Sequence, residues 1–193
     1  FSGSTLRGAD FHEADGEQPD FSEANLKQAT LTQVGFTEPG FTHAQLNGAQ
    51  LQNGRFREGD FQGATLRGAS LQNGKFQRAC LDNADLRETV LDNVQFQDSE
   101  LNDANLQEAE GGRTTFTRAR LQNADLQSVE LPDATFDSAV LQQANLRGAE
   151  LPDASLEDAS LEGADLQGAN LEGATLDHAS LEGADLQGAN LEG

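Results

Sequence analysis

The chain has 193 residues, with 33 aspartates and glutamates against 12 lysines and arginines, so its formal net charge is −21 at pH 7. Such a chain repels nucleic acids and anionic membranes and attracts cationic partners. No apolar run is long enough for a membrane span or a signal-peptide core. We therefore expect no direct contact with nucleic acid or membrane, and although the sequence does not specify the compartment, the cytoplasm is favoured.

From the first residue onward, a large apolar residue occupies every fifth position. These 39 centre positions hold 26 leucines, 11 phenylalanines and two glycines, Gly16 and Gly111. A small residue, most often alanine, stands two positions before each centre. A period of five fits neither a helix, on which successive leucines would scatter, nor a flat strand, on which they would alternate between faces. The pattern predicts a chain that turns a corner once per unit and keeps leucine and alanine inside.

A second period, of 20 residues, orders the phenylalanines. Phe1, Phe21, Phe41 and Phe61 form one series, and the segment SLEGADLQGANLEG at 160–173 recurs at 180–193. Four five-residue units therefore close one coil, and coils stack so that like residues lie above one another. The sequence predicts an all-β solenoid, a parallel β-helix. Its longest core ladder should consist of Phe36, Phe56, Phe76, Phe96, Phe116 and Phe136.

Three segments depart from the repeat within this single domain of residues 1–193. Gly16 leaves a gap in the centre positions and is followed by Pro19, Pro39 takes a small inward position, and Gly111 leaves a second gap. Because glycine and proline interrupt regular structure, we expect irregular backbone near 16–20, 39–40 and 110–115.

The charged residues are unevenly distributed. Beyond Arg147 there is no further lysine or arginine, and 11 acids follow between Glu150 and Glu192. One interpretation is a solvated surface that discourages aggregation; the other is an acidic face for a protein with a basic surface. The candidate partner-binding residues are Glu162, Asp165, Glu172, Glu182, Asp185 and Glu192.

The 20-residue period sorts the cations into two groups. Because the cations lie in the earlier part of the rod and the last part carries only acids, an electrostatic head-to-tail contact between rods is a further interpretation. One column holds Arg7, Lys27, Arg67, Arg87 and Arg147. The other group lies around the long phenylalanine ladder and consists of Arg55, Arg57, Lys75, Arg78 and Arg118.

Residues that could support catalysis or bind a metal are scattered. His12, His43 and His178 fall on different coils or sides, and Cys80 has no histidine near it. Paired carboxylates act as general acid and base only in a cleft that gives them different environments. We predict no catalytic residue, cofactor or metal, and no enzyme activity.

The repeat A-[D/N]-L-x-x, seen as ADLQG, ANLEG, ADLRE and ANLKQ, resembles that of the pentapeptide-repeat proteins over essentially the whole chain. The resemblance implies a right-handed quadrilateral β-helix with four pentapeptides per coil. Some members confer quinolone resistance by imitating duplex DNA and occupying DNA gyrase. Those members dimerise through a C-terminal helical segment, which has no counterpart here, so none of their functional residues is carried over.

Two function classes remain. The first is a non-catalytic rod that serves as a scaffold, spacer or docking module with an acidic surface, as in bacterial multidomain proteins that carry such repeats. The alternative is a DNA-mimicking inhibitor or protector of DNA gyrase. A leucine-rich-repeat horseshoe agrees less well with the even five-residue spacing. The chain has no helical cap and no methionine, so we expect part of a larger protein, or a chain without its native termini, whose uncapped ends allow end-to-end association.

Overall fold

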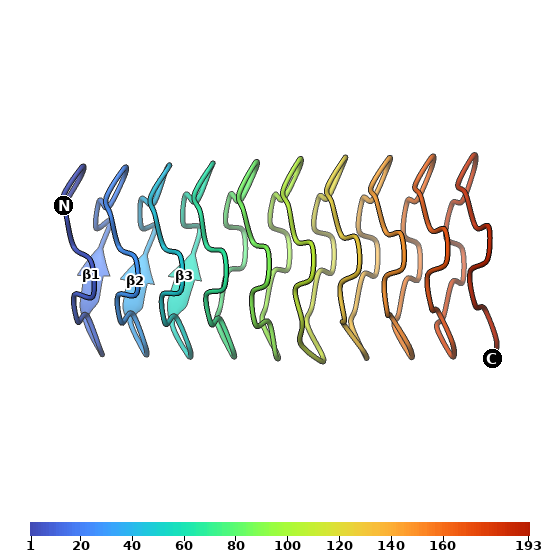
Figure 1. The fold of residues 1–193 in the computed structure, drawn as a ribbon, viewed down its shortest axis with the longest axis horizontal. Coiled ribbons are helices and arrows are strands. Elements are labelled where there is room, and N and C mark those ends of the chain that lie inside the picture. Colours follow the sequence, from blue (N-terminus) through green and yellow to red (C-terminus); the bar gives the residue numbers. More distant parts are fainter.

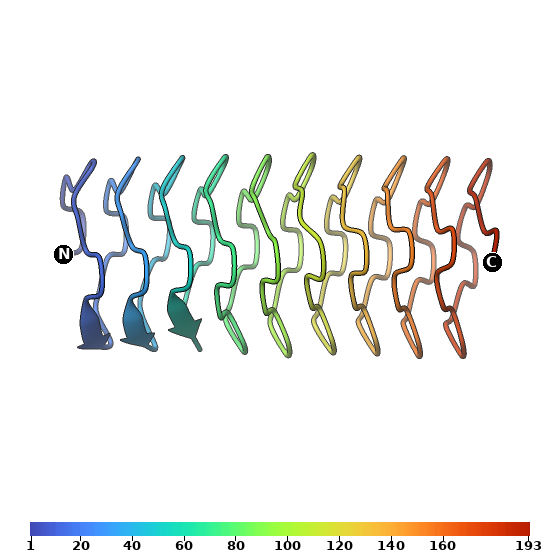
Figure 2. The same ribbon diagram turned by 90° about the horizontal axis from the view of Figure 1, so that it is seen from below.

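The computed structural model describes all residues from 1 to 193 and contains strands but no helix. Figure 1 shows a single solenoid of similar coils stacked along one axis, with the termini at opposite ends. The three named strands are β1 (Asp15–Glu17), β2 (Gly35–Thr37) and β3 (Arg55–Arg57). They lie side by side in successive coils at the N-terminal end (Figure 2). The predicted all-β solenoid is confirmed.

Successive coils pair in parallel, with every paired residue 20 positions from its partner. Phe36 of β2 pairs with Gly16 of β1 and Phe56 of β3. Elsewhere, single parallel bridges continue the pattern as far as Asn170 and Asn190, and each bridge falls on the residue before a centre. Four unbroken ladders result. We name the side of the rod beside each ladder by its first centre residue: the Phe1, Leu6, Phe11 and Gly16 sides.

Backbone hydrogen bonds join each unit to both neighbouring coils. In the unit centred on Leu26, its amide donates to Gln45 O (2.8 Å) and that of Gln28 to Asn47 O (3.0 Å), both in the next coil. The amide of Asn25 donates to the preceding coil, to Ser4 O (2.8 Å). Interior coils are therefore held from both directions.

A β-turn forms the corner between units. Ala29 N donates to Leu26 O (3.0 Å), and Gln28, the third residue of the turn, has φ +60°. A positive φ at the third residue is what a type II turn requires. Glycine meets this requirement most easily, as at Gly163 (φ +68°), while the other corners use polar residues and never a β-branched one. This explains the recurring glycine of LEG, LQG and LRG.

The three segments expected to be irregular all stay in the 20-residue register. Pro19 and Pro39 have no N–H with which to close a turn, and the chain before them is extended as β1 and β2. At Gly111 the backbone approaches the preceding coil so closely that a Cβ would lie 2.4 Å from Asp92 N. The Thr114 hydroxyl donates there to Leu91 O (2.7 Å). Local deviations are thus absorbed within one unit.

The interior is one continuous cluster of 53 buried hydrophobic residues, built from the centres and the small residues before them. Glycine replaces alanine where a neighbouring ring fills the space of the methyl group. A Cβ on Gly54 would lie 2.4 Å from Phe56 Cε2, and one on Gly74 would lie 2.8 Å from Phe76 Cε2. Because interiors are close-packed, small and large residues compensate in adjacent positions.

The phenylalanine rings of the Gly16 side lie one above another. Phe116 and Phe136 stack with centroids 4.8 Å apart and planes inclined by 5°. Phe36 and Phe56 meet edge to face instead, at 6.4 Å and 74°. A Cβ on Gly16 would make ordinary van der Waals contact with Phe36 Cδ1 at 3.7 Å, so the first ring of the ladder packs directly over the glycine.

Both terminal coils are less buried than the interior. Phe1 is 63% exposed and Leu191 is 49% exposed, whereas Leu26 and Leu161 are completely buried. No helix of sufficient length and apolarity to cross a membrane is present.

Candidate protein-interaction surfaces

Aspartate or asparagine before a centre is held in place by the backbone. Asp165 Oδ1 accepts the N–H of Gln167 (3.0 Å), and Asp185 Oδ1 accepts that of Gln187 (3.0 Å). Such a side-chain bond to the backbone two residues on is an Asx-turn. The residue between Ala and Leu in the repeat therefore prepares the corner that follows and points its carboxylate outward in a fixed direction.

The candidate acidic residues form three pairs in successive coils. Asp165 and Asp185 pair in the ladder of the Leu6 side, while Glu162 and Glu182 follow Ser160 and Ser180 on the Phe1 side. Glu172 and Glu192 follow Asn170 and Asn190 on the Phe11 side. The structure thus brings the members of each pair together but places the three pairs on three different sides. The acidic surface wraps the rod rather than occupying one face.

Two of these carboxylates are stabilised in the ionised form. Hydroxyl hydrogen bonds from Ser160 and Ser180 lower the pKa of Glu162 to about 2. The backbone N–H of Gln187 and the side-chain amide of Gln167 lower the pKa of Asp185 below its ordinary value. Both groups therefore keep their charge under mildly acidic conditions.

In the middle of the rod, arginines pair with acids, mostly across coils. Arg67 lies 2.5 Å from Glu88 and Arg118 lies 2.6 Å from Asp98. The pair with Arg118 lowers the pKa of Asp98. The last pair joins Arg147 to Asp165 at 3.3 Å. Beyond Arg147 the acids have no lysine or arginine to offset them, so the final coils are uniformly anionic.

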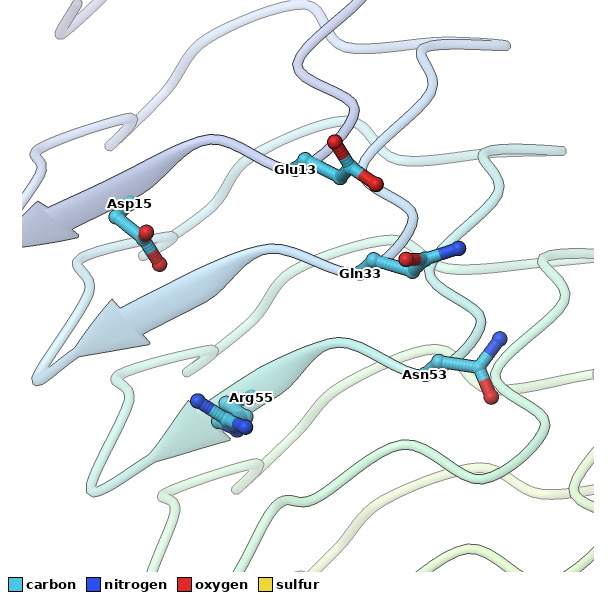
Figure 3. A pocket seen from close by; sticks show the side chains of 5 residues that line it. All are labelled: Glu13, Asp15, Gln33, Asn53 and Arg55. Atoms are coloured by element: carbon cyan, nitrogen blue, oxygen red, sulfur yellow. The ribbon is translucent and has the colours of Figure 1, made fainter.

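The largest hollow on the surface is open and entirely polar (Figure 3). Its volume is about 740 Å³, and no hydrophobic residue lines it. Gly35 lies between Asp15 and Arg55 in the ladder and contributes no side chain. Ligand pockets are usually concave and mostly apolar, with a few polar groups, so this hollow is an unfavourable small-molecule site. Its lining residues are Glu13, Asp15, Gln33, Asn53 and Arg55.

A group near Cys80 was missed by the sequence argument. The ligand atoms of Cys80, Asp82 and Glu100 lie within 4.8 Å of one another. Burial raises the pKa of the Cys80 thiol, and Asp82 Oδ1 already accepts the backbone N–H (2.8 Å) and side-chain amide (3.1 Å) of Asn102. The 20-residue spacing of Cys80 and Glu100 could have indicated that these two residues are neighbours. His12 is bonded separately, with its Nδ1 2.7 Å from Thr32 Oγ1.

Solved structures include similar folds. A trypsin-treated form of QnrB1, a plasmid-mediated fluoroquinolone resistance protein, is 16% identical, with 88% of this chain and 90% of that chain covered at a TM-score of 0.55. HetL from the cyanobacterium Nostoc sp. strain PCC 7120, involved in heterocyst differentiation regulation, is 28% identical, with 97% and 87% covered and a TM-score of 0.40. A pentapeptide-repeat protein from the Arabidopsis thaliana thylakoid lumen is 26% identical, with 66% and 68% covered and a TM-score of 0.35.

Two family descriptions match the sequence itself. "Pentapeptide repeats" matches residues 79–110, 114–153 and 154–193 in eight copies, and "Pentapeptide repeat region" matches residues 4–86. No curated protein matches the chain. The centre residues, the small residues before them and the 20-residue ladders account for these matches along nearly the full length. The chain therefore belongs to the pentapeptide-repeat family.

Proposed function

We propose that the chain is a non-catalytic interaction rod, a right-handed quadrilateral β-helix whose final coils dock a protein with a basic surface. The observation that supports this most directly is the set of three acidic pairs beyond Arg147. The two members of each pair lie in adjacent coils, which are separated by the strand spacing of about 4.8 Å. A partner with cations at a similar spacing would match both carboxylates of a pair at once, and one that wraps the rod would reach more than one pair.

The fold suits this role because it separates structure from recognition. Centres and small residues fill the interior, and the backbone bonds run between coils. The other residues of each unit remain free to carry charge without altering the core. A field of one sign accelerates encounter with an oppositely charged partner and disfavours like-charged ones. Asx-turns hold Asp165 and Asp185 in place before binding, so little ordering is needed.

Binding to an oligolysine peptide, with oligoglutamate as the negative probe, tests the proposal. The variant replaces Glu162, Glu172, Glu182 and Glu192 by glutamine and Asp165 and Asp185 by asparagine. The matched control neutralises six N-terminal acids by the same amide replacements: Asp10, Glu13, Asp15, Glu17, Asp20 and Glu23. We expect the variant to lose about tenfold or more in affinity, and the control far less, because local complementarity governs binding. Equal losses would mean that only net charge matters and would overturn the proposal.

A DNA-mimicking action on DNA gyrase is the second candidate. It is supported by the fold shared with QnrB1 at a TM-score of 0.55 and by the net charge of −21. A gyrase supercoiling assay decides the matter. Inhibition at micromolar protein that is lost in the six-residue acidic variant would support this function, and absence of inhibition would eliminate it.

End-to-end association is a further proposal for the described chain. Both terminal coils expose apolar residues, Phe1 at one end and Leu191 at the other. In the interior, carbonyls such as Gln45 O accept an amide from the preceding coil, and the equivalent carbonyls of the first coil have no such neighbour. Stacking of opposite ends would supply those bonds and give an open-ended series of oligomers, visible by light scattering. A single closed species would contradict it.

A further inference from the structure

The Gly16 side carries a group of cations and, further along the rod, a group of acids, while Asp15, Glu17 and Glu38 lie before the cations. Arg55, Arg57, Lys75 and Arg78 lie in two adjacent coils and form what we call the basic half. Nearer the C-terminal end of the same side lie four acids, called here the acidic half. These are Asp137, Glu157, Asp158 and Asp177.

The cations of the basic half are mostly unpaired within the chain. Arg78 contacts Glu58, but Arg55, Arg57 and Lys75 make no ion pair, and Arg57 Nε donates only to the amide oxygen of Gln77 (3.1 Å). A hollow of about 370 Å³ lies beside them, lined by Phe36, Thr37, Gly35, Arg55, Arg57, Glu58 and Arg78. On a chain with 33 acids, three neighbouring cations without a carboxylate form a surface suited to an anionic partner.

The other three sides carry fewer unpaired cations. On the Leu6 side, Arg67, Arg87 and Arg147 each have a carboxylate of the same chain within 3.3 Å. The two remaining cations of that side, Arg7 and Lys27, make no ion pair and lie in the two N-terminal coils. The Phe1 side has one cation, Arg120, and the Phe11 side has one, Arg113. The Gly16 side therefore has the largest group of unpaired cations, three against two on the Leu6 side.

The two halves match each other under a two-fold rotation. With the axis perpendicular to the rod at the coil of Phe116, the coil of Phe56 faces that of Leu176, and the coil of Phe76 faces that of Leu156. This juxtaposes Arg55 and Arg57 with Asp177, and Lys75 and Arg78 with Glu157 and Asp158. Counting only the residues on the Gly16 side, the two coils of the basic half carry a net charge of +3 and the two facing coils carry −3. Self-complementarity of this kind is what a two-fold dimer interface requires.

At the axis itself, the geometry avoids direct repulsion between like charges. Arg118 would meet its symmetry copy, but its guanidinium is already paired with Asp98 at 2.6 and 2.8 Å. Thr115 and Thr117 are the other outward residues of that coil. One coil from the axis, Asp98 faces Asp137 of the other copy. The matched charges of the two halves lie two and three coils from the axis, about 10 and 14 Å to either side.

We propose that two copies of this chain associate side by side and antiparallel through the Gly16 side. Each contact between basic and acidic halves occurs twice. The three acidic pairs that include Glu162, Asp165 and Glu172 lie on the other three sides and remain accessible. Pairing of two copies does not depend on the binding of a basic protein to the acidic pairs, so an experiment can disprove one of these proposals without disproving the other.

Sedimentation velocity of the full chain tests the proposal, at about 0.1 M and about 0.5 M NaCl because the Debye length shortens from about 10 Å over this range. We expect a closed dimer at the lower salt that weakens at the higher. Arg55→Glu with Lys75→Glu should weaken it about tenfold or more, and Glu157→Lys with Asp177→Lys should do the same. Mixing the two variants should restore a dimer, because each then offers the charges that the other lacks.

Lys27→Glu with Arg120→Glu is the matched control. It changes the net charge by the same amount as Arg55→Glu with Lys75→Glu, but on the Leu6 and Phe1 sides. This control should leave the dimer unchanged. A monomer at about 100 µM, where a Kd of that order would be visible, would overturn the proposal. So would a dimer insensitive to both reversals, or failure of the mixed variants to pair. An open-ended series of oligomers would indicate end-to-end stacking instead.

Discussion

Residues 1–140 and 141–193 have the same fold but differ in almost every non-backbone feature. The first region contains all the phenylalanines, 11 of the 12 cations and the three named strands. The second has leucine at every centre, alanine at every small position and one cation, Arg147. The same four ladders nevertheless run through both without a shift. The inter-coil backbone bonds are therefore common to both regions, while the interior residues and the surface charges vary.

The comparison also separates two ways of filling the interior. In the first region, rings are accommodated by glycine, as at Gly54 beside Phe56, or by a tilt, as at Phe36 over Gly16. In the second, alanine and leucine repeat without adjustment. Substitutions should consequently have local costs in the first region and nearly uniform costs in the second, apart from the terminal coil.

The largest effect should follow from loss of a ring in the ladder. Phe116→Ala removes a fully buried ring that stacks on both neighbours, and we expect it to lower the free energy of unfolding by about 3–5 kcal/mol. Leu186→Ala, in the partly buried terminal coil, should cost less than half as much. Urea denaturation measures both. Equal losses would mean that the terminal coil is as well packed as the middle.

Gly54→Ala should have the next largest effect. Its methyl group would overlap the Phe56 ring at 2.4 Å, and overpacking of this kind costs about 1–3 kcal/mol. In a Phe56→Leu background the penalty should fall, because the ring that fills the space is gone. A double-mutant cycle by urea denaturation gives the coupling. An unchanged penalty would place the strain in the backbone rather than in the ring.

The pKa of Glu162 should depend on the hydroxyls beside it. Because its pKa is lowered from an ordinary 4.5 to about 2, its contribution to stability is complete above pH 4.5 and is lost as the pH falls through 2. Ser160→Ala should move the titration midpoint of Glu162, followed by carboxyl NMR, toward 4.5. The midpoint of Asp185, whose donors are Gln187 and Gln167, serves as the control. No movement of Glu162 would assign the shift to other donors.

The smallest effect should come from salt. The final coils hold acids without cations, whereas the middle holds ion pairs such as Arg118 with Asp98. Screening should therefore slow amide exchange near residues 165–175 and leave it unchanged, or slightly faster, near residues 85–120. Hydrogen exchange at low and high NaCl measures the difference. A uniform response in both regions would show that like-charge repulsion in the final coils is negligible.

Much of the fold could be predicted from the sequence, because both periods are visible in the residues themselves. The five-residue period identifies which residues are inside, and the 20-residue period identifies which lie above one another. The edge-to-face contact of Phe36 and the close backbone approach at Gly111 could not be predicted, since they depend on how the chain relaxes around missing side chains.

The candidate site was less accessible to sequence reasoning than the fold. The acidic residues and their pairing by 20 could be identified, but a run of acids in the sequence suggests one face where the structure distributes them over three sides. The unpaired state of Arg55, Arg57 and Lys75 depends on side-chain reach between coils. The five- and 20-residue periods therefore do not indicate which cations lack an ion pair.

Because the register of the ladders is unbroken, the length of the rod is set by its number of equivalent coils. Arg120 and Val140 occupy equivalent places in one ladder, so excising residues 121–140 would join matching points and shorten the rod by one coil of about 4.8 Å. Duplication of such a segment would lengthen it by the same step. Insertions or deletions of 20 residues, or a multiple of 20, can therefore adjust the length of the rod in discrete steps. A change of a different size would move the residues of one ladder onto another side.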